Sequence, residues 1–373
     1  MKQHTTLLRR AMAFELSAFK VINRFKPHIL MILLQICVAS VYFLTEDSFN
    51  QGLNPHIYVT YRHAAGSLMM FPFAYFLERK IRPKLTLAVF LEIFLLSLLG
   101  VSLALNLYFA SMKYVHPTFM TAVVNTIPCM TFIIAVVFRL EIVDVRSPRG
   151  IAKILGTLAS LVGVMVIAFY KGPAVPSLKG APIHLGTNSV HENWLKGSIL
   201  TVASCILWSS FYIMQAFTLK KYPAKLSISA WMNCIGAAQS AVYTIIVQPK
   251  AAAWSTTSGI DLWCIIYSGA VSSCLNLFIQ LWCIEQKGPV FVTIFNPLTT
   301  VIVAVAAYFL VGEKLHTGCI LGGLIVIIGL YSLLWGKEGD QHCIKNQKQS
   351  FPACDEQKKP DDHAFTLSET DIH

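Results

Sequence analysis

Charged and hydrogen-bonding side chains stand inside long apolar runs of this sequence, where each of them needs a partner. The sharpest case is Arg62, which lies beside Tyr61 in the apolar run 57–77. A charge in the middle of a hydrocarbon layer costs roughly 2.5–3.5 kcal/mol on insertion scales. One interpretation is that Arg62 faces a wet cavity and attracts a carboxylate, which a guanidinium binds well. The alternative is that it reaches the nearer interface, with Tyr61 as an interfacial anchor.

A second charged group, Glu92, lies in the apolar run 85–110. A carboxyl group at such a position is able to carry a proton and to couple its movement to that of a solute. The alternative is a structural role, as the partner of a nearby cation such as Lys84 or Arg82. Glu141 and Glu313 end two later runs, and we expect each to pair with a neighbouring cation.

Uncharged amides are the more numerous polar groups within the runs. Gln35, Asn125 and Asn296 are predicted either to bind ammonium and carboxylate groups or to bridge helices, as such side chains do in membrane bundles. Asn276 and Gln280 are four residues apart, so they share one face of a helix and predict a polar stripe. That stripe faces either a cavity or a neighbouring helix.

Two prolines, Pro128 and Pro297, interrupt apolar runs at related places. A proline removes a backbone donor and frees a carbonyl one turn earlier, which favours a hinge or a gate where the freed groups line a cavity. The surrounding residues of 117–141 recur 172 positions later in 289–313: Pro117, Phe119, Thr121, Ala135 and Glu141 correspond to Pro289, Phe291, Thr293, Ala307 and Glu313.

The helices that follow these stretches also match. Gly156, Gly163 and Lys171 recur 166 positions later as Gly322, Gly329 and Lys337. Trp231 aligns with Tyr61 at a spacing of 170, and this aromatic side chain either stacks on a substrate or packs against lipid and helices. A duplicated unit with an interrupted helix in each copy is typical of transporters.

Composition places the chain in a membrane. Of its 373 residues, 55% are hydrophobic and 13% are charged, where soluble domains carry about 25% charged residues. The net charge of +11 arises from short basic clusters between apolar runs, which act as topology signals and argue against nucleic-acid binding. The ten cysteines form no CxxC pair, so neither a disulfide framework nor a zinc site is predicted.

The elements that position these side chains are ten apolar runs of spanning length. We place them at about 28–45, 57–77, 85–110, 118–138, 151–170, 195–216, 226–247, 260–281, 289–311 and 317–335. The predicted organisation is a segment at 1–27, a first five-helix repeat at 28–170, a linker at 171–194, a second five-helix repeat at 195–335, and a disordered tail at 336–373. The fold class is therefore an all-α polytopic membrane protein.

Lysine and arginine are concentrated in alternate connections, which predicts that both termini are cytoplasmic. Because each repeat has an odd number of helices, the second repeat would then sit upside down relative to the first. Inverted repeats give a protein two near-equivalent shapes, one open to each side of the membrane. The expected mechanism is alternating access to a site near the midplane.

Several motifs resemble the plant nodulin-like transporters, the group of walls-are-thin-related and UMAMIT proteins in the EamA, or drug/metabolite transporter, superfamily. They are KYVHPTF at 113–119, NTIPCMTFIIAVVFRLE at 125–141, WLKGSIL at 194–200, LKKYPAKLS at 219–227, KGPVFVTIFNPL at 287–298 and VIIGLYSLLWGK at 326–337. The resemblance covers residues 26–337 in order. It implies transport of amino acids or related small organic solutes, export-like or bidirectional, across the plasma membrane or the tonoplast.

The third helix departs from the family pattern. Asn106, in the Asn-Leu-Tyr that the resemblance preserves, is counted among the substrate-binding residues, but Ala104 and Leu105 replace the polar residues expected before it. A more apolar binding surface would suit indole or hormone-like solutes, which we keep as the alternative substrate class. A receptor is a weaker alternative, and so is an integral-membrane enzyme because the sequence carries no recognised catalytic motif. The partners expected are a small solute, the lipid bilayer and a coupling proton, with no cofactor and no metal.

Overall fold

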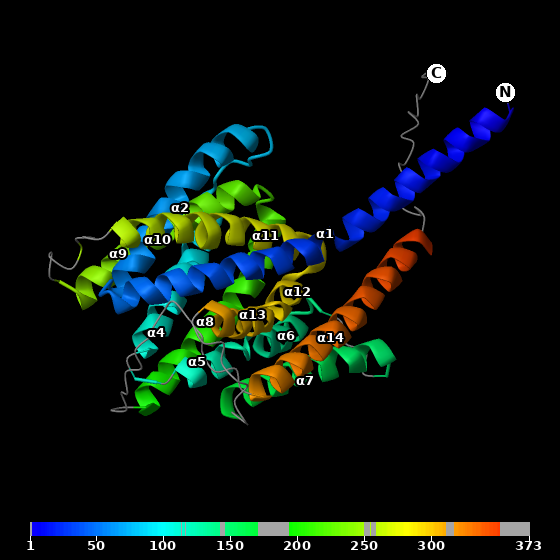
Figure 1. Cartoon of the computed structure of the whole chain (residues 1–373). Helices are drawn as coiled ribbons and strands as arrows, with labels where there is room; N and C mark the ends of the chain where they lie inside the picture. The colour runs from blue at the N-terminus through cyan, green and yellow to red at the C-terminus, as the bar shows by residue number, and fades with distance from the viewer. Residues whose placement is uncertain are drawn as a thin grey trace, which may run out of the picture.

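The computed structural model describes residues 2–112, 114–115, 117–141, 146–170, 194–249, 254, 259–310 and 317–350. Almost all of these residues are helical (Figure 1). The first half contains α1 (Lys2–Asn50), α2 (Pro55–Leu77), α3 (Leu87–Leu96), η1 (Ser97–Leu103), α4 (Ala104–Ser111), α5 (Pro117–Val124), α6 (Ile127–Val137) and α7 (Pro148–Phe169). The second half contains α8 (Trp194–Lys221), α9 (Lys225–Val247), α10 (Gly259–Ser268), η3 (Gly269–Leu275), α11 (Asn276–Lys287), α12 (Pro289–Ile294), α13 (Asn296–Leu310) and α14 (Thr317–Ser350).

Seven helices in the described ranges are long and apolar enough to cross a membrane. The chain is thus an all-helical, multi-pass membrane protein. Each of the ten predicted runs coincides with helical residues, but ten crossings remain a prediction. One physical reason is that the run 118–138 is divided into two short helices, α5 and α6, neither of which is long enough alone.

The two ends of the chain are more helical than predicted. α1 begins at Lys2 and continues through Pro27 without a break, and α14 continues to Ser350. The prediction of a disordered tail from residue 336 is therefore wrong for 336–350, and residues 351–373 lie outside the described ranges. Glu, Gln and Lys after Gly336 are good helix formers. Both extensions leave the bundle on the same side (Figure 1).

The predicted interruptions are present in both halves. α5 ends at Val124 and α6 begins at Ile127, while α12 ends at Ile294 and α13 begins at Asn296. Pro128 and Pro297 each stand in the first turn of the new helix, where no backbone N–H is needed. In addition, η1 and η3 are seven-residue π-helical turns 172 positions apart. π-helical turns are rare and frequently lie at functional sites.

Equivalent helices from the two halves pack against each other and run antiparallel. In the α2–α9 pair, the Thr60 and Thr244 hydroxyls lie 3.3 Å apart. At the other end of this pair, the Glu78 carboxylate accepts hydrogen bonds from the backbone N–H groups of Leu226 (2.8 Å) and Ser227 (2.7 Å) at the start of α9. A carboxylate is well placed there because the N-terminus of a helix offers unpaired donors and a positive dipole end.

α7 and α14 lie side by side along most of their length (Figure 1). A Cβ added at Gly156 would lie 2.7 Å from the Gly329 carbonyl, and one at Gly163 would lie 2.7 Å from the Gly322 carbonyl. The glycines thus allow backbone-to-backbone contact. The order of these contacts shows that this pair is also antiparallel.

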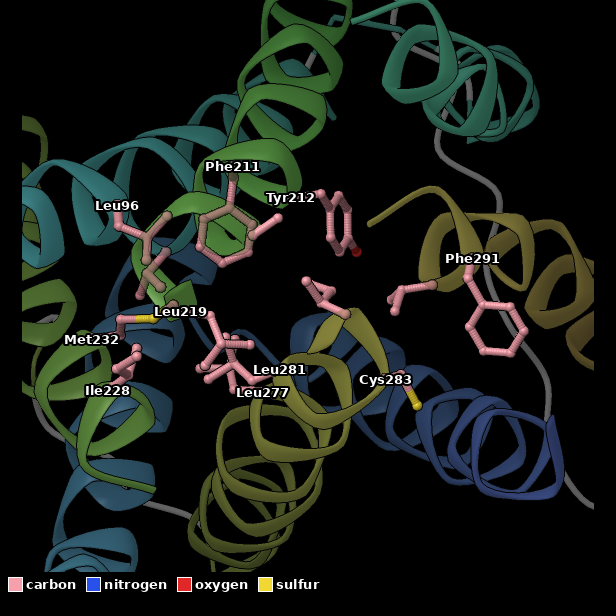
Figure 2. Packing of buried hydrophobic residues seen from close by; sticks show 14 of the residues in the cluster. Leu96, Phe211, Tyr212, Leu219, Ile228, Met232, Leu277, Leu281, Cys283 and Phe291 are labelled. Carbon is pink, nitrogen blue, oxygen red and sulfur yellow. The ribbon is translucent and has the colours of Figure 1, made fainter. Parts of the chain in front are cut away.

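The main hydrophobic core lies where α8, α9 and α11 meet the first half of the chain. Figure 2 shows Phe211 and Tyr212 of α8 facing Leu277 and Leu281 of α11, with Leu96 of α3 close to Phe211. These side chains fill the space among the helices, so polar groups near them are enclosed by protein.

Candidate functional site

A central polar cluster is built where α1, α5, α8, α11 and α13 approach one another. The Thr299 hydroxyl of α13 donates to the Gln35 carbonyl oxygen of α1 at 2.5 Å. On α11, the Gln280 amide donates to the Asn276 side-chain oxygen at 2.8 Å, which confirms that these two side chains share a face. We define the central polar cluster as Gln35, Asn125, Tyr212, Asn276, Gln280, Asn296, Thr299 and Thr300.

Tyr212 links the α11 part of the cluster to the α13 part. Its ring belongs to the hydrophobic core, while its hydroxyl lies close to the side chains of Asn296 and Gln280. Figure 2 shows the Tyr212 ring in the space between α8 and the segment that carries Phe291. A tyrosine that is apolar on its body and polar at its tip is suited to the border between a packed core and a polar site.

The helix interruption in the first half brings Asn125 into the cluster. Asn125 follows the last residue of α5, and its amide donates to the Thr121 carbonyl (2.7 Å) and to the Thr300 hydroxyl (3.0 Å). The contact with Thr300 joins the broken helix of the first half to that of the second. Five of the residues predicted from sequence therefore meet in one place, and every residue of the cluster is uncharged.

Arg62 lies apart from this cluster, in a group formed by α2, α9 and η3. Its guanidinium donates to Nε2 of His63 at 3.1 Å and lies 5.5 Å from the centroid of the Tyr58 ring. The Asn233 amide donates to the Ser229 and Ser273 carbonyls, which leaves its oxygen to accept from Nδ1 of His63 at 2.8 Å. His63 is thus a neutral imidazole held between Arg62 and Asn233.

The surroundings of the Arg62 side chain bear on its two predicted roles. The side chain is partly buried and packs against an aromatic ring within the protein, and its Nε atom is buried without a partner among the described residues. The Tyr61 hydroxyl donates to the Trp254 carbonyl at 2.8 Å. The guanidinium is therefore turned into the protein, and the interfacial role of Tyr61 stays a prediction.

Asn106 is fully buried, and its side chain bonds to the preceding turn and to two neighbouring helices. Its amide donates to the Ser102 carbonyl (2.8 Å) and to the Ser240 hydroxyl (3.1 Å), and its oxygen pairs with Nδ1 of His56 at 2.9 Å. Asn106 thus holds α2, α4 and α9 together. Trp231 packs edge-on against Phe71, with ring centroids 5.6 Å apart.

Two glutamates pair with cations other than those expected. Glu92 forms an ion pair with Lys221, not with Arg82 or Lys84, because α8 ends beside α3. Glu141 pairs with Lys337 of α14 instead of with a neighbour in sequence. Both corrections have one cause, which is that the partner comes from the other half of the chain. Glu313 lies outside the described residues.

The sequence did not single out Tyr212, Thr299 or Thr300. Threonine and tyrosine are common in membrane helices, so residue type alone gives no signal there. Thr299 and Thr300 follow Asn296 by three and four residues, and Tyr212 lies on another helix. That they belong to one polar cluster becomes visible only when the helices are packed together. Within the described ranges, no group of three or more His, Cys, Asp or Glu side chains is able to hold a metal ion.

Comparison with known proteins gives the family. The EamA-like transporter family matches two stretches, residues 26–169 and 195–335. The WAT1-related protein At4g08300 of Arabidopsis thaliana is 39% identical over 326 residues, which cover 86% of this chain and 87% of that protein. At4g08290, a WAT1-related protein of the same plant, is 36% identical over 361 residues and 94% of each chain.

The fold is shared with a solved crystal structure. It superposes with a TM-score of 0.64 at 13% identity and covers 83% of this chain and 98% of that one. The family resemblance drawn from the motifs is confirmed by the two matched stretches and by the plant relatives. The chain therefore belongs to the EamA-like transporter family and is similar to the WAT1-related proteins of plants.

Proposed function

We propose that the chain is a secondary transporter that moves amino acids or related small organic solutes across a membrane, by export or in both directions. The observation that carries this proposal is the central polar cluster. Uncharged amides and hydroxyls from five helices gather inside a membrane-spanning bundle, where polar groups are costly unless they pair or serve a solute. The match to a family of transporters supports the same conclusion.

The proposed mechanism is alternating access between two inverted five-helix repeats, with ten crossings in all. It is supported by the antiparallel packing of equivalent helices, α2 with α9 and α7 with α14. If equivalent helices run in opposite directions, exchange of the two repeats' conformations turns an opening on one side into an opening on the other. The paired helix interruptions at Asn125 and Asn296 are then the places where the bundle bends.

We assign the residues different roles within this mechanism. Gln35, Asn125, Asn276, Gln280 and Asn296 line the solute path, and Tyr212 forms its aromatic wall. Pro128 and Pro297 fix the starts of the helices that move. For the remaining predicted residues we propose helix packing at Asn106 and Trp231.

Arg62 and Glu92 are the charged residues of the proposal. We infer that Arg62 attracts the carboxylate of an approaching solute, since its guanidinium lies beside the bundle core but outside the central cluster. Glu92 pairs with Lys221, whose side chain is 59% exposed. This contact supports the structural role, and proton coupling through Glu92 remains a prediction.

An indole or hormone-like solute is the second candidate substrate class. Aromatic side chains gather in the hydrophobic core that Tyr212 shares: the rings of Phe291 and Phe295 are 5.2 Å apart, and Trp208 and Trp282 pack against the same core. A flat apolar solute with one polar group would suit such a wall. We further propose cytoplasmic termini, which the common side of the α1 and α14 extensions supports, and the plasma membrane or the tonoplast as the location.

The proposed function is tested by counterflow in liposomes. Liposomes that contain the purified chain are loaded with an unlabelled solute. Entry of labelled amino acids or of labelled indole-3-acetate into these liposomes is then followed. Gln35→Leu removes an amide that the proposal places on the solute path, and it is expected to raise KM for the transported solute by about tenfold, the cost of one lost hydrogen bond. Ser332→Ala, on the exposed face of α14, is the matched control. Absence of counterflow by wild type for every solute would reject the transporter assignment.

A further inference from the structure

A buried amide on α8 lies outside the central polar cluster. Gln215 is completely buried, and neither its side-chain oxygen nor its nitrogen has a hydrogen-bond partner among the described residues. The Thr218 hydroxyl, one turn further along, is also buried without such a partner. An unpaired buried polar group costs about 1–3 kcal/mol, so two in succession call for an explanation.

Neighbouring contacts show which way these side chains face. Positions 211, 215, 218 and 222 follow the 4–3–4 spacing of one helix face. At one end of this face, the Phe211 ring occupies the space that a Cβ at Gly100 of η1 would need. At the other end, the Tyr222 hydroxyl accepts from Nε of Arg82 at 3.2 Å, just before α3. Gln215 and Thr218 therefore lie between α8 and the α3–η1 segment.

This interface has a second unusual property. The π-helical turn η1 begins at Ser97, in the middle of what would otherwise be one continuous helix with α3 and α4. A π turn replaces the ordinary backbone pattern, and such turns are frequent at functional sites. The unpaired side chains of Gln215 and Thr218 thus lie along α3, next to the point where it passes into this irregular turn.

We propose that Gln215 and Thr218 form a ligand-recognition site for a solute that carries a primary carboxamide. A primary amide offers a donor and an acceptor side by side, which are the two groups that the Gln215 side chain requires. The Thr218 hydroxyl serves as an additional donor or acceptor. Gln215 is enclosed in this conformation, so the ligand reaches it when α8 and η1 separate.

The inference rests on the proposed function, because it describes a step along the solute path. Tyr212 of the central polar cluster lies three residues before Gln215, on the adjoining face of α8. A solute leaving the cluster toward Arg82 would therefore meet Gln215 and then Thr218. The site would select amides over apolar isosteres, since its polar groups stay unpaired with the latter.

A binding assay tests the site separately from transport. Thermal unfolding of the full purified chain in detergent is followed with 10 mM asparagine or glutamine, and with leucine or methionine as the near-isosteric solutes without an amide. We expect the amides to raise Tm of wild type by about 2 °C or more and the apolar solutes to have no effect. No rise with either amide overturns the proposal.

Variants then locate the effect. Gln215→Leu is expected to weaken amide binding by at least about tenfold, and Thr218→Val to weaken it to a smaller degree. Ser209→Ala is the matched control, because Ser209 is equally buried on α8 but its hydroxyl donates to the Ile127 carbonyl at 3.4 Å. An amide-induced rise that survives in Gln215→Leu overturns the proposal.

The Tm of the Gln215→Leu chain without ligand tests the proposal independently. Removal of an unpaired amide leaves Tm of the free Gln215→Leu chain unchanged or higher, whereas removal of a bonded one lowers it. A lower Tm therefore overturns the proposal in favour of a structural role. If the amides bind as expected but counterflow fails for every solute, the recognition site is supported and the transporter assignment is the one rejected.

Discussion

The buried ion pair between Glu141 and Lys337 gives the most quantitative prediction. It joins the end of α6 to α14, and the side chains are only 9% and 8% exposed. Removal of one partner leaves a charge buried without compensation, which costs about 3–5 kcal/mol. We therefore expect Lys337→Met to lower the free energy of unfolding by that amount. At about 2 °C per kcal/mol, typical of larger domains, Tm falls by roughly 6–10 °C.

Replacement of both partners has the opposite expectation. In Glu141→Met combined with Lys337→Met neither charge of this pair remains, and apolar side chains of similar length fill the space. Buried ion pairs exchanged for apolar groups are often neutral or stabilising, so the double variant is expected to recover most of the lost Tm. The sign of the interaction between the two substitutions is therefore the decisive quantity.

Unfolding of these variants can be followed through buried cysteines of the chain. Cys205, Cys264 and Cys283 are free and buried, so a thiol-reactive fluorogenic dye reports unfolding in detergent as they become accessible. Wild type, both single variants and the double variant are melted under the same conditions. A double variant that melts as low as Lys337→Met would refute the reasoning, because it would show that lost packing, and not the uncompensated charge, causes the instability.

Three further predictions follow from other contacts. Glu78→Ala removes the acceptor for two N–H groups at the start of α9 and is expected to lower the free energy of unfolding by about 2–4 kcal/mol. Glu92→Gln changes a solvent-accessible ion pair and is expected to lower it by at most about 1 kcal/mol. Equal shifts of Tm in the dye assay would contradict this order. Gly163→Leu forces α7 away from α14 and is expected to cost about 3 kcal/mol or more, so an unchanged Tm would show that the helices are not held at this distance. Arg62→Ala is expected to reduce counterflow of solutes with a carboxylate and to spare those without one; an equal loss for both would indicate a folding defect, and no loss would remove Arg62 from the solute path.

Local chemistry made much of the helix pattern predictable. Apolar runs predicted where helices form, and Asn-Pro and Asn-x-x-Pro predicted where α12 gives way to α13 and α5 to α6. The ends were harder to predict, because hydropathy reports burial in lipid while helix propensity decides continuation. For this reason α14 extends beyond Gly336 as a polar helix.

The central polar cluster was predictable in part. Gln35, Asn125 and Asn296 stand out as amides in apolar surroundings, where a polar group needs a partner. The partners themselves, Thr299, Thr300 and Tyr212, depend on which helices touch. The same limit explains Glu141, whose partner Lys337 is almost two hundred residues away in the chain. Spacing along one helix predicts a face, but only packing decides what that face meets.

The glycine contacts between α7 and α14 have a wider consequence. Gly156 lies against Gly329, and Gly163 lies against Gly322. In the repeat, Gly322 is the equivalent of Gly156 and Gly329 is the equivalent of Gly163, so the two contacts are equivalent to each other. A surface that meets its own equivalent in this reciprocal way is isologous, as in a homodimer with a twofold axis. The two helices therefore form a self-complementary seam. Any substitution at one of these positions alters a contact made by both halves, and one half taken alone carries a surface whose natural complement is a second copy of itself.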